Sequence, residues 1–170
     1  MEVALITVGD ELLSGDTVDT NAAWLADRLT DRGVAVTRVL SLPDDRETIT
    51  THVETYSDTF DRVLITGGIG GTPDDVTMEA VADAFDCEMA ASELTLEAVD
   101  RRLAEIEGRL PDRELAVDRE AEAAIPAESR PLINEAGLAP GCVVANVYVL
   151  PGIPEELKAM FESVAEEFTG

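Results

Sequence analysis

The 170-residue chain has little lysine, little histidine and few aromatic side chains. Its 12 basic residues face 36 aspartates and glutamates, which gives a formal net charge of −24 at pH 7. A surface with this charge repels polyanions, so we expect no nucleic acid partner. Since Lys158 is the only lysine, the carboxylate excess indicates a high-salt cytoplasm. At 1 M salt the Debye length is only about 3 Å, so an anionic small molecule can still bind.

Cysteine and long apolar runs are also scarce. Cys87 and Cys142 lie far apart and lack C-x-x-C spacing, so we expect two reduced thiols rather than a disulfide framework or a zinc site. No basic leader opens the chain, and the apolar run at 143–150 is far shorter than the roughly 20 residues of a membrane helix. These absences predict a cytoplasmic protein without a membrane partner.

Short apolar runs alternate with helical patterns over the first half of the chain. We predict strands at 3–8, 34–40 and 62–66, and helices at 21–32, 45–57 and 75–85. In the first of these helices Ala22, Leu25 and Leu29 share one face, and Gly33 follows as a left-handed cap. The βαβαβα order predicts an α/β fold with a mainly parallel sheet covered by helices on both faces.

The second half departs from this alternation. With 45% hydrophobic residues the chain can build one core, so we expect residues 1–170 to form a single domain. Residues at about 90–130 suggest a protruding helical subregion, with an apolar stripe from Leu96 to Ile106 and a second helix after Pro111 that runs to Ile125. That stripe could contact a partner.

The remainder of the chain is expected to complete the sheet. A loop rich in proline and glycine leads into a single apolar strand at 143–150. This loop contains Pro126, Pro131, Gly137, Pro140 and Gly141. A last helix follows Pro154, and its apolar residues recur at helical spacing and should pack on the sheet. They are Leu157, Phe161, Val164 and Phe168.

A glycine-rich loop follows the strand at 62–66. Glycines let backbone N–H groups approach an anion, and a following helix N-terminus adds partial positive charge, so such loops bind phosphate. The loop is neither a P-loop nor a dinucleotide fingerprint, because Gly-Lys-Ser/Thr is missing and the second pattern fails at Pro73. The alternative is a flexible turn with Asp74 or Asp75 as a helix cap. The expected phosphate ligands are Gly67, Gly68, Gly70, Gly71 and Thr72.

Two acidic pairs, Asp44-Asp45 and Asp74-Asp75, each follow a predicted strand. Ligands gather at the carboxyl ends of parallel strands, so both pairs should lie on one rim. A carboxylate about 4 Å from a phosphate meets a repulsion of several kcal/mol at an effective dielectric constant near 20. Mg²⁺ or another divalent cation bound by Asp74 and Asp75 would remove that repulsion. The alternative for Asp44-Asp45 is a helix N-cap.

Five short motifs are spread along the chain. They are Thr7-x-Gly9-Asp10-Glu11-Leu12-Leu13-Ser14-Gly15, Asp19-Thr20-Asn21-x-x-Trp24-Leu25, Gly67-Gly68-Ile69-Gly70-Gly71-Thr72-Pro73-Asp74-Asp75-Val76-Thr77, Asn134-Glu135-Ala136-Gly137-Leu138-Ala139-Pro140-Gly141 and Leu150-Pro151-Gly152-Ile153-Pro154-Glu155-Glu156-Leu157. Their combination resembles the molybdopterin-binding domain family of MoaB and Mog proteins. Within that family it is most similar to the N-terminal domain of CinA, the competence/damage-inducible protein.

The resemblance implies a three-layer α/β/α domain that binds molybdopterin or a related nucleotide pyrophosphate. In Mog-type enzymes, which adenylate molybdopterin with ATP and Mg²⁺, the catalytic aspartates match Asp44 and Asp75. In CinA-type relatives the domain is linked to hydrolysis of ADP-ribose. The resemblance also implies a homo-oligomer, either a dimer or a trimer. Further ligand-binding positions would be Asn134, Gly137, Pro140 and Gly141.

The chain departs from the family pattern at two loops. Gly71 stands where the family usually has proline, and 125–129 lacks the glycine that commonly follows its proline. The sequence also lacks the deamidase domain of full-length CinA proteins, so we do not expect deamidation of nicotinamide mononucleotide. Three functions stay open: molybdopterin binding in molybdenum cofactor biosynthesis, metal-dependent ADP-ribose pyrophosphate hydrolysis, and a non-catalytic binding or scaffold subunit.

Overall fold

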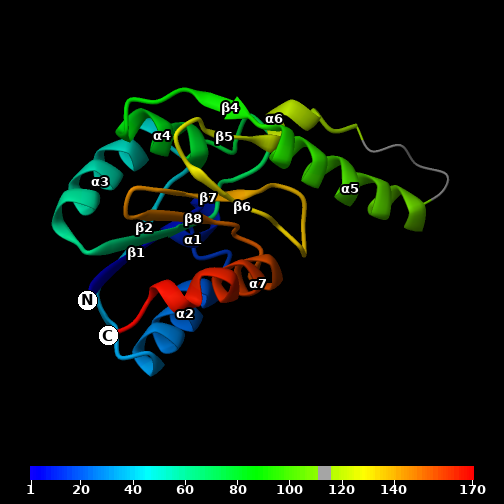
Figure 1. Ribbon diagram of the computed structural model, residues 1–170. Helices are drawn as coiled ribbons and strands as arrows, with labels where there is room; N and C mark the ends of the chain where they lie inside the picture. Colours follow the sequence, from blue (N-terminus) through cyan, green and yellow to red (C-terminus); the bar gives the residue numbers. More distant parts are fainter. Residues whose placement is uncertain (111–115) are drawn as a thin grey trace.

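The computed structural model describes residues 1–110 and 116–170 (Figure 1). A six-stranded sheet in the order β2-β1-β3-β8-β7-β6 forms its centre. The strands are β1 (Glu2–Val8), β2 (Ala35–Leu42), β3 (Arg62–Thr66), β6 (Arg130–Leu132), β7 (Gly141–Val144) and β8 (Val147–Leu150). Strands β2, β1, β3 and β8 pair in parallel, whereas β7 is antiparallel to both of its neighbours. The predicted α/β fold with a mainly parallel sheet is confirmed.

Helices cover both faces of this sheet, which gives three layers (Figure 1). Helices α2 (Thr20–Asp31) and α7 (Pro154–Val164) pack on one face, and α3 (Arg46–Thr59) and α4 (Thr77–Ala84) pack on the other. Leu25 and Phe161 are buried in the first layer, and Ile49 and Val81 in the second. Each fully buried side chain of this size contributes about 1.5–3 kcal/mol relative to exposure. Gly33 has a φ of +77°, as predicted for the residue after α2.

The parallel strands place several loops at one edge of the sheet. β1, β2, β3 and β8 all end there, so the segments that follow them become neighbours. Backbone hydrogen bonds link two of these loops to adjacent strands: Gly9 N donates to Leu42 O at 3.0 Å, and Gly67 N donates to Leu150 O at 3.2 Å. The glycine-rich loop and the short helix α1 (Asp10–Leu13) therefore emerge side by side.

The apolar run at 143–150 forms a hairpin rather than the single strand predicted from its sequence. β7 and β8 pair antiparallel through Val144 and Val147, with Ala145 and Asn146 in the turn. Ala145 adopts a φ of +50°, which glycine or asparagine usually supplies, so the turn gave no ordinary sequence signal. The side chain of Asn146 stabilises the turn by donating to the carbonyl oxygens of Ser57 at 2.9 Å and Phe60 at 3.0 Å.

A two-stranded sheet lies beside the central sheet, and one of its strands occupies the end of a helix predicted from the sequence. It pairs β4 (Met89–Ala91) with β5 (Ala124–Pro126). Helix α6 (Arg119–Ala123) ends before Ile125, which pairs with Ala90, so the helix predicted to reach Ile125 is wrong at its end. The cause is Pro126, because proline holds the preceding residue in an extended conformation. Pro111 lies outside the described residues.

Pro131 lies in a segment that was predicted to be a loop but that forms an edge strand in the structure. Pro131 is in β6, the last strand of the central sheet. An edge strand tolerates proline because the missing N–H removes no ladder hydrogen bond on the open side. The predicted loop therefore begins only after Leu132.

Helix α5 (Glu93–Arg109) reaches away from the sheet (Figure 1). Ser92 and Thr95 form a capping box at its start. Along the apolar stripe Val99 is buried, whereas Leu96 and Ile106 are half-buried. An ion pair between Arg119 and Asp100 connects α6 to α5 at 2.5 Å. We call β4, α5, α6 and β5 the arm.

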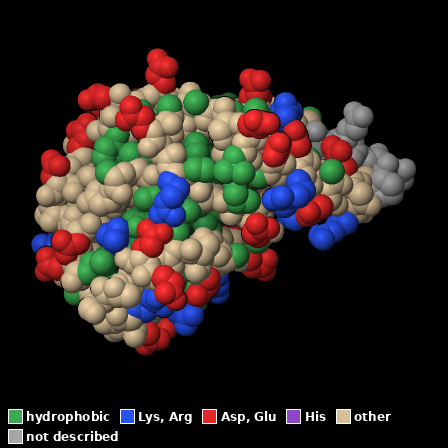
Figure 2. Space-filling view, viewed as in Figure 1, with side chains coloured by type: hydrophobic (Ala, Val, Ile, Leu, Met, Phe, Trp, Pro, Cys, Tyr) green, Lys and Arg blue, Asp and Glu red, His purple; other side chains and the backbone are tan. Residues whose placement is uncertain are grey.

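One face of the molecule carries its negative charge in a dispersed pattern. Figure 2 shows carboxylates scattered across the visible face rather than gathered in one patch. Arginines lie among them, and several form exposed ion pairs, such as Arg28 with Glu162 at 2.8 Å. Among the helices of the described ranges, none has the length and apolar character needed to cross a membrane.

Candidate functional site

A cavity of about 460 Å³ opens at the carboxyl edge of the sheet. Its walls come from the segments that follow β1, β3 and β8, from the start of α2, and from Asp44, Asp74 and Asp75 of the two acidic pairs. The lining residues are Val8, Gly9, Glu11, Leu12, Thr17, Val18, Asp19, Thr20, Asn21, Asp44, Thr66, Gly67, Gly68, Ile69, Asp74, Asp75, Gly152, Ile153 and Pro154. We call this the main cavity.

The glycine-rich loop enters the main cavity in a conformation that needs glycine. Gly67 and Gly68 have φ values of +92° and +69°. A Cβ atom on Gly67 would collide with the carbonyl oxygen of Val8, and one on Gly68 would collide with the Thr77 hydroxyl. Thr77 fixes the loop, because its Oγ1 donates to Gly67 O at 2.7 Å and its N donates to Gly68 O at 3.1 Å. Backbone thus forms this part of the wall.

The same loop also borders a second, smaller cavity. Gly70, Gly71 and Thr72 line a space of about 120 Å³ between the loop and the arm, and Asp75 lines both cavities. The five predicted phosphate ligands therefore do not converge on one space. Two of them face the main cavity, and three face the arm.

Glu122 of α6 lies directly against this second part of the loop. A Cβ atom on Gly71 would stand 3.1 Å from both Cγ and Oε1 of Glu122. Burial raises the pKa of the Glu122 carboxyl above its usual value, and the nearby backbone N–H of Gly71 opposes part of that rise. The negative charge of Asp75 adds to that rise. An internal carboxylate thus lies beside a backbone donor that the sequence assigned to a ligand phosphate.

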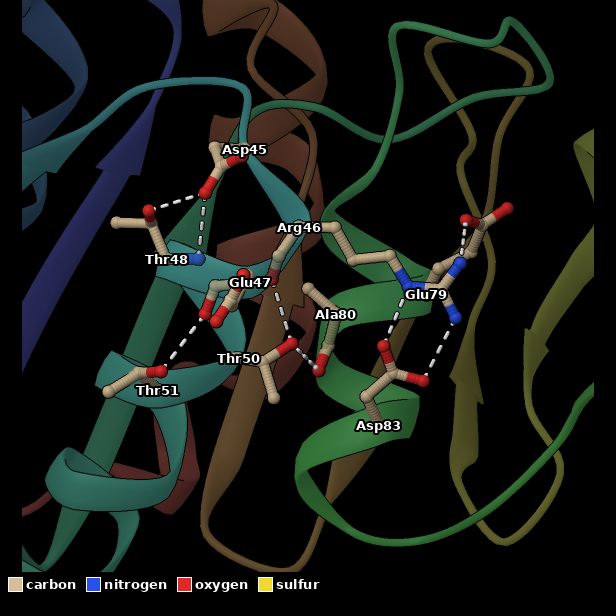
Figure 3. Close-up of polar contacts among 9 residues, drawn as sticks. All are labelled: Asp45, Arg46, Glu47, Thr48, Thr50, Thr51, Glu79, Ala80 and Asp83. Atoms are coloured by element: carbon tan, nitrogen blue, oxygen red, sulfur yellow. Dashed lines mark hydrogen bonds and ion pairs between the residues drawn. The ribbon is translucent and has the colours of Figure 1, made fainter.

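The two aspartates matched to catalytic positions, Asp44 and Asp75, line the same cavity, together with Asp74. Asp45 does not line it, because Asp45 is the N-cap of α3. Its Oδ2 accepts hydrogen bonds from Thr48 N at 3.0 Å and Thr48 Oγ1 at 2.5 Å (Figure 3). The N-cap alternative is therefore confirmed for Asp45, which leaves Asp44 to face the cavity.

An arginine bridge holds α3 beside α4 below this rim (Figure 3). The Arg46 guanidinium donates to both carboxylate oxygens of Asp83, at 2.6 and 2.9 Å, and to Glu79 at 2.9 Å. Thr50 adds a hydrogen bond to the carbonyl oxygen of Ala80 at 3.1 Å. The start of α3, which directly follows Asp44 and Asp45, is thereby held against α4.

Asp44 lies in an electrostatically unfavourable position. Burial raises its pKa above the usual value, and the neighbouring charges of Asp10, Glu11 and Asp75 raise it further. One hydrogen bond opposes part of this effect, because Asp10 N donates to Asp44 Oδ2 at 3.2 Å. In return, Asp44 N donates to Asp10 Oδ1 at 3.0 Å. A bound cation would relieve the repulsion among these carboxylates.

Asp75 has a different local environment. Its Oδ2 accepts from Thr72 Oγ1 at 2.7 Å and from Thr72 N at 3.3 Å. Val76 occupies the N-cap position of α4 and makes no side-chain cap, so the interpretation of Asp74 or Asp75 as a helix cap is wrong. Asp74 is exposed at the rim.

The carboxylates suit a divalent cation only in part. Within residues 1–110 and 116–170, no group of three or more histidine, cysteine, aspartate or glutamate side chains is arranged to hold a metal ion. Mg²⁺ is usually bound by one or two carboxylates together with waters and substrate phosphates. Asp44 and Asp75 therefore fit such an ion when ligand oxygens or water complete its coordination.

The four C-terminal positions predicted from the resemblance lie elsewhere. Asn134, Gly137, Pro140 and Gly141 line neither the main cavity nor the second cavity. Asn134 is buried and its Nδ2 donates to Glu156 at 2.7 Å and to the carbonyl oxygen of Ala139 at 3.0 Å. These contacts shape the connection between β6 and β7 against α7.

Other residues of the main cavity were not predicted as site residues. Asp19 caps α2 through Ala22 N at 3.2 Å and also accepts from Thr7 Oγ1 at 2.7 Å. Asn21 Nδ2 donates to Gly152 O at 2.7 Å, which joins the start of α2 to the segment after β8. Both residues lie in a motif that carries the family resemblance, so that motif could have indicated them. Their side-chain types alone gave no reason to place them in the site.

Comparison with known proteins identifies the family. Residues 4–169 match the family described as "Probable molybdopterin binding domain". A protein of Archaeoglobus fulgidus is 39% identical over 99% of this chain and 69% of its own length. A CinA-like protein of Citrifermentans bemidjiense is 41% identical over 100% of this chain, which spans only 41% of that relative.

Solved structures agree with this result. The CinA protein of Thermoplasma acidophilum superposes with a TM-score of 0.88 and 31% identity, covering 100% of both chains. The molybdopterin biosynthesis enzyme MoaB of Thermus thermophilus has a TM-score of 0.61 and 22% identity, covering 97% of this chain and 89% of its own. At that identity the MoaB likeness shows the fold alone.

Proposed function

Because the chain belongs to the molybdopterin-binding domain family, we propose that it binds molybdopterin or a related nucleotide pyrophosphate with Mg²⁺ or another divalent cation. One observation carries the proposal: Asp44, Asp75 and the bare backbone at Gly67 and Gly68 share one cavity of about 460 Å³. That volume is within the range of small-molecule sites.

The charges of the site support a role for the cation. The described lining of the main cavity contains five carboxylates and no lysine, arginine or histidine, so a pyrophosphate would meet net repulsion there. A divalent cation supplies the positive charge that phosphoryl oxygens need in group transfer or hydrolysis. The raised pKa of Asp44 makes it a better proton acceptor than an ordinary aspartate, and Thr72 holds the carboxylate of Asp75 in place.

Two reactions are compatible with these groups. In molybdenum cofactor biosynthesis the site would transfer a nucleotide to molybdopterin. In the second candidate it would hydrolyse the pyrophosphate of ADP-ribose, the reaction that the resemblance to CinA-type proteins implies. Each reaction requires stabilised charge on phosphoryl oxygens and a carboxylate that orients or deprotonates the attacking group.

One experiment separates these functions. The protein is incubated in molar KCl with Mg²⁺ or Co²⁺ and either ADP-ribose or ATP plus molybdopterin, and the products are identified by mass spectrometry. AMP plus ribose phosphate supports hydrolysis, and adenylated pterin supports cofactor synthesis. Saturable binding without turnover supports a binding or scaffold subunit. Folded protein that binds none of these compounds contradicts the proposal.

The oligomeric state and the cellular environment of the protein can also be proposed. We infer a homo-oligomer, either a dimer or a trimer, in a high-salt cytoplasm, without nucleic acid or membrane partners. The half-buried stripe from Leu96 to Ile106 on α5 supports an interface, and the net charge of −24 supports the salt. Sedimentation in molar KCl tests the assembly, and a monomer at all concentrations would contradict it.

A further inference from the structure

Two exposed apolar side chains stand out at the main cavity. Val18 is 79% exposed and Ile153 is 59% exposed, and no other large apolar side chain in the described ranges is as exposed as either. Both line the same cavity as Asp44 and Asp75. On so acidic a surface, exposed apolar groups that gather at a cavity mark a contact for something apolar.

The backbone around both residues is fixed by hydrogen bonds. Val18 O accepts from Thr20 N at 2.8 Å, and Thr17 N donates to Glu11 O at 3.0 Å. On the other side, Gly152 O accepts from Asn21 Nδ2 at 2.7 Å, which ties the residue before Ile153 to the start of α2. The two side chains are therefore presented on connected segments rather than on independent loops.

The lining of the cavity thus contains two chemically different kinds of group. Carboxylates and glycine backbone suit a phosphate–cation complex, whereas Val18, Ile153 and the half-buried Leu12 supply apolar surface. A nucleotide or pterin pyrophosphate has the same division, because a charged phosphate end is linked to a planar heterocycle. A flat ring removes apolar surface from water when it lies against aliphatic side chains.

We propose that Val18 and Ile153 bind the planar heterocycle of the ligand, adenine or pterin, and so select ring-bearing pyrophosphates over inorganic pyrophosphate. This inference rests on the proposed function, since it assigns the second half of the same ligand. Val18 and Ile153 are specificity residues in this scheme. The carboxylates determine whether a phosphate–cation complex binds at all.

The test compares two probes on matched variants. Binding of ADP-ribose and of inorganic pyrophosphate, each with Mg²⁺ in molar KCl, is measured by calorimetry for the wild type, for Val18→Ser with Ile153→Ser, and for a control. The control combines Val39→Ser and Leu94→Ser, because these side chains are 54% and 53% exposed and lie outside the main cavity. Circular dichroism and sedimentation check fold and assembly.

The proposal expects the cavity variant to bind ADP-ribose roughly 10-fold more weakly, with pyrophosphate binding unchanged and the control equal to the wild type. Equal ADP-ribose binding in all three proteins would overturn the ring contact while leaving the proposed function intact. Failure of the wild type to bind either probe would instead contradict the proposed function. A changed oligomeric state in the cavity variant would identify the two residues as an interface between copies, which also overturns the proposal.

Discussion

In the pair Asp44-Asp45, the second aspartate caps a helix and the first faces the main cavity; in the pair Asp74-Asp75, neither caps a helix and both face the cavity. The difference arises from where the next helix begins. α3 starts at Arg46, directly after its pair, whereas α4 starts at Thr77, one residue further on, with Val76 at the cap position. A shift of one position in the start of the following helix thus gives two identical residue pairs different structural roles.

The largest expected effect is on Asp75. Asp75→Asn should lower divalent-dependent turnover at least about 100-fold, because it removes the charge but keeps the volume and an acceptor for the Thr72 hydroxyl. The measurement is the initial rate on the substrate identified by mass spectrometry, with circular dichroism as the control for folding. Turnover equal to that of the wild type would contradict the assigned role.

Asp45 should affect stability and leave chemistry unchanged. Asp45→Ala should lower the Tm by roughly 2–4 °C at neutral pH, because it removes the cap of α3. Hydrogen bonds from Thr48 lower the pKa of Asp45, so its contribution is present above the unfolded pKa of about 3.9 and is lost as the pH falls through the lower folded value. Thermal scans at several pH values measure this. A loss of turnover in the Asp45→Ala variant would show that Asp45, like Asp44, takes part in the chemistry, which contradicts this prediction.

Ionised Asp44 should change the stability of the fold in the opposite direction from ionised Asp45. Its folded pKa is raised, mainly by burial, so ionised Asp44 destabilises the fold at neutral pH, and the effect disappears below the unfolded pKa. Asp44→Asn should therefore raise the Tm by roughly 1–2 °C near pH 7 in EDTA and have no effect at low pH. Divalent-dependent turnover should fall in the same variant. A lower Tm at pH 7 would show that the contacts with Asp10 outweigh the repulsion.

The smallest effect is expected at Asp74. Asp74 is exposed at the rim, so its charge is screened by salt. Asp74→Asn should weaken divalent binding only about 2-fold in molar KCl, and more at low salt. Titration with Mn²⁺ at two salt concentrations tests this. An effect as large as that of Asp75→Asn would assign both aspartates of the pair to the cation.

Local sequence signals predicted one part of the molecule and missed another. The first three βα units followed from periodicity, and the meeting of Asp44 and Asp75 followed from the direction of parallel strands. The hairpin at Ala145 was missed because alanine rarely adopts a positive φ. The split of the glycine loop was missed because it depends on packing of the arm, whose Ala121 and Ala124, about fifty residues later, line the second cavity.

The contact between Gly71 and Glu122 makes the loop its own competitor. A carboxylate tethered by the fold has a high effective concentration beside this N–H, so an incoming anion has to compete with it. Glu122 belongs to α6, so the affinity of the loop for an anion depends on a side chain that the arm supplies (Figure 1).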